Sequence, residues 1–77
     1  MPALGGRHDR VRRLARDHRE IQILRLVSEG LRNREIGERL RISEDTVKWY
    51  LKRLFAKLYV TTRTSAVARG RELGLLP

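Results

Sequence analysis

Apolar positions along the chain recur every three or four residues, which is the spacing of one face of an α-helix. The clearest case begins at the segment SEDTVKWYLK, residues 43–52. Wound at about 100° per residue, this segment and its continuation put four apolar side chains on one stripe: Val47, Leu51, Leu54 and Leu58. No stretch of the sequence alternates apolar and polar residues with a period of two, as a half-buried strand does. The pattern predicts an all-α fold.

Capping signals divide the first half of this pattern into two helices. Asp17 can cap the first helix, and Glu20 follows three residues later, as a capping box requires. Gly30 ends that helix, because a residue without Cβ adopts the left-handed conformation most easily. Asn33 is the candidate N-cap of a short second helix, REIGERL. Helical spacing gives the first helix an apolar face: Ile21, Leu24, Val27 and, beyond the glycine, Leu31.

Two hydroxyl residues begin the remaining helices. Ser43 precedes a third helix over residues 44–58, and Thr62 precedes a fourth over residues 63–73, which stops at Gly74. A short helix, a three-residue turn and a longer helix make a helix-turn-helix motif, predicted here over about residues 35–54. The sequence thus predicts a compact four-helix bundle. A glycine inside the second helix, Gly37, suggests close backbone approach to the third.

The composition narrows the functional classes. The chain has 77 residues and a net charge of +9, which together suggest one small domain with a nucleic-acid partner. There is no cysteine, which fits a reducing cytoplasm, and no apolar run approaches the length of a membrane span. We expect a soluble cytoplasmic protein with no membrane partner. The glycines and arginines of residues 1–16 predict a basic flexible arm or linker, with the domain over residues 17–77.

The face of the third helix opposite the apolar stripe carries the candidate chemistry. Lys48 and Lys52 lie one turn apart with Trp49 between them, and these three side chains can meet base edges in a major groove. Arg53 and Lys57 continue the cationic face toward phosphate oxygens. The structural alternative is that Trp49 packs onto a neighbouring helix or a dimer partner.

Enzymatic chemistry has little support in the sequence. The two histidines, His8 and His18, have no paired carboxylate cluster, and no glycine-rich phosphate loop occurs. We expect no enzyme activity, no metal site and no cofactor. The helical glutamates are interpreted as caps and solvated faces with cationic partners: Glu20, Glu29, Glu35 and Glu38.

Three stretches carry a resemblance to a known family: REIQILRLVSEG, NREIGERLRISEDTVKWYLKRLFAKL and RTSAVARGRELGLL. In this order and spacing the chain from Arg19 to Leu76 resembles the LuxR/GerE-type helix-turn-helix domain of bacterial transcription regulators. The segments REIQIL and TVKWYL are most similar to the large MalT-like members. The resemblance implies a bacterial, nucleoid-associated DNA-binding domain that works as a dimer, often through its fourth helix, on inverted-repeat promoter sites.

The resemblance also assigns roles by motif position. Lys48, Trp49 and Lys52 match base-facing positions of the family. Other positions match residues that hold phosphates or start a helix: Asn33, Thr46 and Lys57.

Several positions depart from the family pattern, including one near Arg16, where the hydrophobic residue that usually precedes the first helix is replaced. Tyr50 replaces the usual histidine, Arg53 an asparagine, Gly37 an alanine and Tyr59 a glycine. The last departure means that the end of the third helix must be capped differently.

The fourth helix allows two interpretations. Ala66, Val67, Gly70 and Leu73 can cover the core of the monomer. Ala66 and Gly70, one turn apart, would also permit close approach of a second subunit, an alternative that the resemblance favours. The domain can be monomeric in solution and dimeric on its site.

Two other functions remain open at this point. A module like region 4 of sigma factors has similar first helices and contacts RNA polymerase, although the segment RTSAVARGRELGLL argues against it. A protein-interaction domain that presents its cations to an acidic partner is the other alternative.

Overall fold

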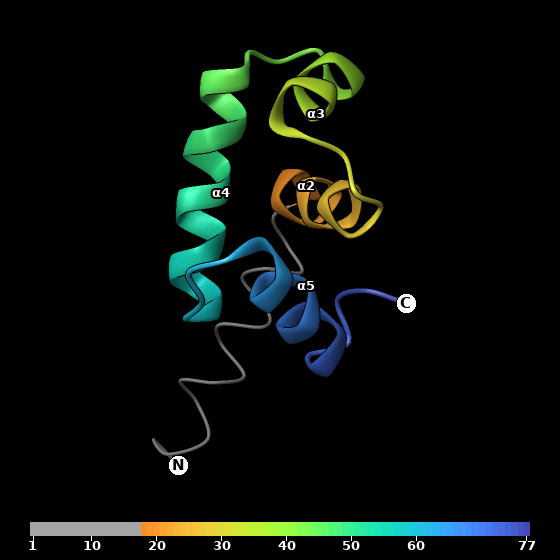
Figure 1. Ribbon diagram of the computed structural model, residues 1–77, viewed down its shortest axis with the longest axis vertical. Helices are drawn as coiled ribbons and strands as arrows, with labels where there is room; N and C mark the ends of the chain where they lie inside the picture. The colour runs from red at the N-terminus through yellow and green to blue at the C-terminus, as the bar shows by residue number, and fades with distance from the viewer. Residues whose placement is uncertain (1–17) are drawn as a thin grey trace.

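Four helices make up the part of the chain that the computed structural model describes, residues 18–77 (Figure 1). The all-α prediction is confirmed for these residues. The predicted arm over residues 1–16 and the predicted cap at Asp17 lie outside them. The fourth helix ends one residue earlier than predicted. The helices are α2 (His18–Ser28), α3 (Asn33–Leu40), α4 (Glu44–Leu58) and α5 (Arg63–Glu72).

The predicted caps of three helix ends are present. The Ser43 hydroxyl accepts a hydrogen bond from the Thr46 backbone N–H at 3.0 Å, and the Thr62 hydroxyl accepts one from the Ser65 N–H at 3.1 Å. Gly30, after α2, has φ of +88°, the left-handed conformation that its position predicted. These bonds satisfy backbone groups that each helix leaves unpaired at its ends.

The predicted N-cap of α3 was wrong by one residue. Arg32 occupies the cap position with an extended backbone, and Asn33 is the first helical residue. Glu35 accounts for this start, because its carboxylate accepts the Arg32 N–H at 2.8 Å. The Asn33 side chain is therefore not needed as a cap, and its Oδ1 atom is buried without a hydrogen-bond partner.

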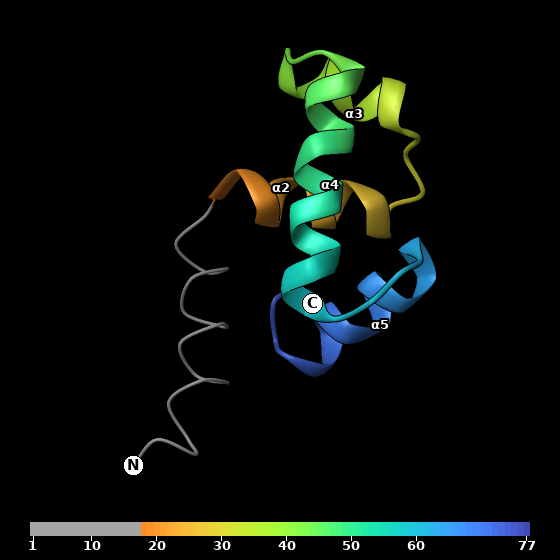
Figure 2. The same cartoon turned by 90° about the vertical axis from the view of Figure 1, so that its left-hand side faces the viewer.

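α4 lies along one side of the other three helices and contacts each of them (Figures 1 and 2). Its predicted stripe is buried in full, which confirms the assignment of its inner face. The core also contains two residues that the simple spacing of α2 did not select, Ile23 and Leu26. The buried apolar residues are Ile23, Leu24, Leu26 and Val27 of α2, Ile36 of α3, Val47, Leu51, Leu54 and Leu58 of α4, Ala66 of α5, and Leu76.

The connection between α3 and α4 depends on close backbone packing. A Cβ atom at Gly37 would lie 2.7 Å from the carbonyl oxygen of Ile42, closer than real Cβ contacts. The Ile42 N–H donates to the Gly37 carbonyl at 2.9 Å, so the turn folds directly onto the helix. The predicted close approach at this glycine is confirmed, and the backbone in contact is that of the turn leading into α4.

The end of α4 is capped by a residue that the family pattern did not predict. Tyr59 itself adopts the left-handed conformation, with φ of +57°, and its N–H donates to the carbonyl of Ala56 at 3.3 Å. A residue with a Cβ is strained there by about 1–2 kcal/mol. The expectation that this end is capped differently was therefore wrong, because Tyr59 adopts the left-handed conformation usual for glycine.

On α5, the structure supports the core interpretation of the small residues. Ala66 and Gly70 are buried, and a Cβ at Gly70 would lie 2.9 Å from Cδ2 of Leu24 and 3.1 Å from Cδ1 of Leu76. Both positions face the monomer core, so they are not available as a contact for a second subunit. Val67 and Leu73 are half-buried.

Substitution of the two helical glycines by alanine should have different effects on stability. Both changes gain about 1 kcal/mol of helix propensity. Gly37→Ala meets a backbone carbonyl that cannot move without displacing the turn, and overpacking of this kind costs about 1–3 kcal/mol. Gly70→Ala meets the ends of two leucine side chains, which can rotate away. We expect Gly37→Ala to lower the free energy of unfolding in urea, and Gly70→Ala to change it less; the reverse order would contradict this packing.

Candidate nucleic-acid interface

The outer face of α4 is exposed and cationic. Trp49 is 52% exposed, which confirms that the ring points away from the core. Lys48, Lys52 and Arg53 are also exposed. The single tryptophan of the sequence thus lies at an exposed position, where a polar residue is more usual.

Two neighbours restrain the indole ring of Trp49. The Tyr50 ring packs edge-on against it, with ring centroids 5.0 Å apart and an interplanar angle of 75°. The Arg53 guanidinium carbon lies 4.7 Å from the centroid of the indole, within the range of a cation–π interaction. The ring is therefore exposed but held, which reduces the entropy lost when a partner contacts it.

A buried carboxylate contacts two cationic side chains of α4. Glu20 of α2 is 0% exposed, and its two carboxylate oxygens accept hydrogen bonds from the Lys57 ammonium at 2.9 and 2.8 Å. The Arg53 Nε atom lies 3.5 Å from the same carboxylate. The interpretation of Glu20 as a residue on a solvated face was wrong. The missed signal was its spacing from Ile23, Leu24 and Val27, which puts it on the buried face.

This contact bears on the phosphate role predicted for Lys57. The Lys57 side chain is 25% exposed, and its ammonium donates hydrogen bonds to both carboxylate oxygens of Glu20. The predicted contact with phosphate stays a prediction. To make it, the ammonium would have to leave its ion pair with Glu20.

The start of α4 presents further polar groups. Lys48 lies 3.7 Å from Glu44 in an exposed ion pair, which contributes little to stability and leaves the lysine able to change partner. The Thr46 hydroxyl lies 2.8 Å from the Ser43 hydroxyl. Within the described part of the chain, no hydrogen bond or ion pair involves the Lys52 ammonium.

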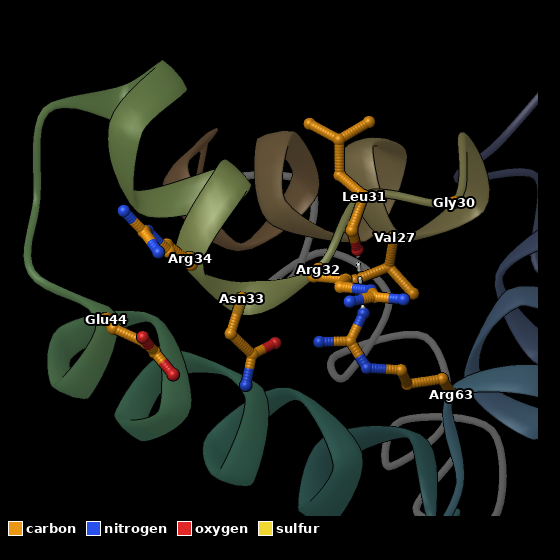
Figure 3. Close-up of a pocket in the computed structure, with 8 residues that line it drawn as sticks. All are labelled: Val27, Gly30, Leu31, Arg32, Asn33, Arg34, Glu44 and Arg63. Carbon is orange, nitrogen blue, oxygen red and sulfur yellow. Dashed lines mark hydrogen bonds between the residues drawn. The ribbon is translucent and has the colours of Figure 1, made fainter.

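A hollow of about 630 Å³ lies beside the N-terminus of α3 (Figure 3). Arg63 of α5 reaches across it, and its Nη1 atom donates to the Leu31 carbonyl at 3.0 Å. The guanidinium groups of Arg63 and Arg32 and the N–H groups of the helix start favour an anion there, whereas Glu44 opposes one and Arg34 is paired with Glu38. These three arginines were not predicted from the sequence, because Arg63 is far from Arg32 and Arg34 along the chain and joins them only in the fold. The lining residues are Val27, Gly30, Leu31, Arg32, Asn33, Arg34, Glu44 and Arg63.

Residues 18–69 match the family of bacterial regulatory proteins called the luxR family. The chain belongs to the luxR family. The matched segment covers α2, α3, α4 and most of α5, so it includes the whole helix-turn-helix and its outer face. The domain is therefore a DNA-binding module of a family of transcription regulators, and not an enzyme.

Several bacterial transcription regulators are similar to this chain. The HTH-type transcriptional regulator AlkS of Alcanivorax borkumensis is 53% identical over 58 residues, which are 75% of this chain and 7% of AlkS. The DNA-binding transcriptional activator DevR/DosR of Mycobacterium tuberculosis is 46% identical over 54 residues, 70% of this chain and 25% of that protein. The transcriptional regulatory protein LiaR of Bacillus subtilis is 48% identical over 48 residues, 62% and 23% respectively. The chain thus spans only a small part of these relatives.

No helix within residues 18–77 is both long and apolar enough to span a membrane. Over the same residues, no group of three acidic or histidine side chains could hold a metal ion.

Truncation of Trp49 should cost the luxR domain little stability. Its exposed ring makes one edge-on aromatic contact and one cation–π contact, together worth about 1–2 kcal/mol. We expect Trp49→Ala to lower the free energy of unfolding by no more than that amount. The fully buried Leu54 is the control, since Leu54→Ala should cost about 2–5 kcal/mol. Equal losses in urea titrations would show that the tryptophan serves the core.

Proposed function

We propose that this domain binds duplex DNA in a sequence-specific manner, with α4 in the major groove. The observation that carries the proposal is the outer face of α4, where Lys48, Trp49 and Lys52 point away from the core side by side. Two ammonium groups can donate to guanine O6 and N7, and the indole offers an apolar surface to thymine methyl groups. The 15 residues of α4 leave room for contacts at bases and at both flanking backbones.

Phosphate contacts would hold the helix in the groove. Our candidates for these contacts are Arg53, which is exposed on α4, and Thr46 and Asn33, near the starts of α4 and α3. The arginine-lined hollow beside Asn33 adds favourable charge. Such contacts orient the protein and make affinity depend on salt, but carry no sequence information.

We also propose that two copies bind an inverted-repeat site through α5. Ala66 and Gly70 are buried in the core of the monomer. The contact between copies would therefore use the outer side of α5, where Val67 is half-buried and Ala68 exposed. A shallow hollow of about 330 Å³ between α2 and α5 lies on this side. Its lining residues are Val27, Ser28, Arg63, Thr64, Val67, Ala68 and Arg71.

The whole protein would then be a transcription regulator. The aligned residues are only 7% of AlkS, so this relative is a large protein, as our assignment to the large MalT-like regulators requires. The family match favours this function over a sigma-factor module or a purely protein-binding domain. Contact with RNA polymerase is compatible with this function. We propose that contact for the whole regulator and not for this domain by itself.

Alanine substitutions on α4 should separate base contacts from general charge. Lys48→Ala and Lys52→Ala should each weaken binding to the preferred duplex by about 1–3 kcal/mol and relax base preference. The preferred duplex is first selected from a random DNA pool, and affinities are measured by fluorescence anisotropy. Arg25→Ala is the control with the same change of charge, at an exposed position on α2. If Lys48→Ala weakens preferred and random duplexes equally, its role at bases is excluded.

A charge on the outer side of α5 should separate dimer from monomer binding. Val67→Asp should weaken binding to a duplex with two half-sites by about 100-fold, because the second copy no longer adds to the affinity of the first. Binding to a single half-site should stay the same. Ser65→Asp, exposed two residues away on another side of the helix, is the control. An unchanged stoichiometry of two chains per duplex for Val67→Asp would exclude this surface.

A further inference from the structure

We propose that Glu20, on a helix outside the motif, determines how selectively α4 binds DNA. The inference rests on the function proposed above and adds a positioning residue to it. Glu20 would act in two ways: it withdraws Lys57 from the cations available to phosphate, and it holds Arg53 against Trp49. Each action follows from a separate contact of the same buried carboxylate.

The first action follows from burial. A carboxylate that is 0% exposed is costly unless cations and hydrogen bonds compensate it. Lys57 supplies two hydrogen bonds at 2.9 and 2.8 Å from a position 37 residues away. DNA phosphates would have to compete with this partner for the ammonium. Lys57 is therefore an internal counterion of Glu20, and the luxR domain binds any duplex with one cation fewer than the sequence of α4 suggests.

The second action concerns the orientation of the indole. Arg53 lies between the Glu20 carboxylate, 3.5 Å from its Nε atom, and the Trp49 ring, 4.7 Å from its guanidinium carbon. The carboxylate is fixed by the core around it, so it limits the positions that the half-exposed Arg53 can take. The guanidinium in turn covers one face of the indole. Loss of the carboxylate charge would let Arg53 leave the ring, and Trp49 would contact bases less uniformly.

Both actions oppose non-specific binding and favour the preferred site. Non-specific affinity grows with the number of phosphates neutralised, whereas specificity needs side chains held in one arrangement at the bases. A buried acid on α2 can shift this balance without touching DNA. Glu20 is thus a positioning residue for specificity.

The test compares Glu20→Gln with the wild type on the preferred duplex and on a random duplex, over a range of KCl concentrations. Glutamine keeps the shape of the side chain and removes its charge. We expect random-duplex binding at low salt to become about three-fold tighter, with a salt slope steeper by about 0.9, as for one more phosphate contact. The preference for the selected duplex should fall by about five-fold or more.

The control is Glu72→Gln, which makes the same change of net charge at an exposed ion pair with Arg69 on α5. It should leave the preference between the two duplexes unchanged. Two further variants separate the two actions. Lys57→Met alone should keep the wild-type salt slope, and Glu20→Gln with Lys57→Met should lose the extra slope while preference stays low. Circular dichroism melts set a temperature at which every variant is folded.

The outcomes are distinct. A wild-type chain that selects no preferred duplex overturns the proposed function itself. A wild-type chain with a clear preference, together with a Glu20→Gln variant that behaves as Glu72→Gln does, overturns only the role of Glu20. If Glu20→Gln does not fold, Lys57→Met still decides the first action. A slope shallower by about 0.9 would then show that Lys57 binds phosphate in the wild type.

Discussion

The rest of the structure depends on the burial of one stripe of α4. Val47, Leu54 and Leu58 are almost fully enclosed, and they contact a core made by α2, α3 and α5. Burial of a side chain of this size contributes about 1.5–3 kcal/mol, so the stripe strongly disfavours rotation of the helix about its axis. Because the inner face is set in this way, the opposite face must be outside. The exposure of Trp49 is a consequence of the packing of its neighbours.

Two contacts then set where α4 lies along and across the core. The backbone contact between Gly37 and Ile42 holds the start of the helix, in the turn that joins it to α3. Lys57 holds the other end by its ion pair with Glu20 of α2. The exposed face between these two points carries Trp49. A luxR domain of this size can therefore present a rigid helix, although a chain so short buries little apolar surface.

Local signals in the sequence predicted the helices and the outward direction of Trp49, because caps and stripes involve residues only three or four positions apart. Ser43 and Thr62 show this directly, since each binds a backbone N–H three residues later. Contacts between distant segments were not predictable in the same way. Lys57, the partner of Glu20, lies 37 residues away along the chain. The sequence therefore predicted that the charged Glu20 faces solvent, whereas the fold places it in a buried ion pair. Similarly, Gly70 was compatible with either a subunit contact or the core, and only its position against Leu24 and Leu76 decided this.

Acrylamide quenching of tryptophan fluorescence tests most directly whether the outer face of α4 binds DNA, because the chain has a single tryptophan. Trp49 should be readily quenched in the free domain and become protected as the preferred duplex is added, in proportion to the fraction bound. A scrambled duplex at higher salt should leave the quenching unchanged. If the preferred duplex saturates the domain and the indole remains as accessible as before, the outer face of α4 is not the DNA-binding surface.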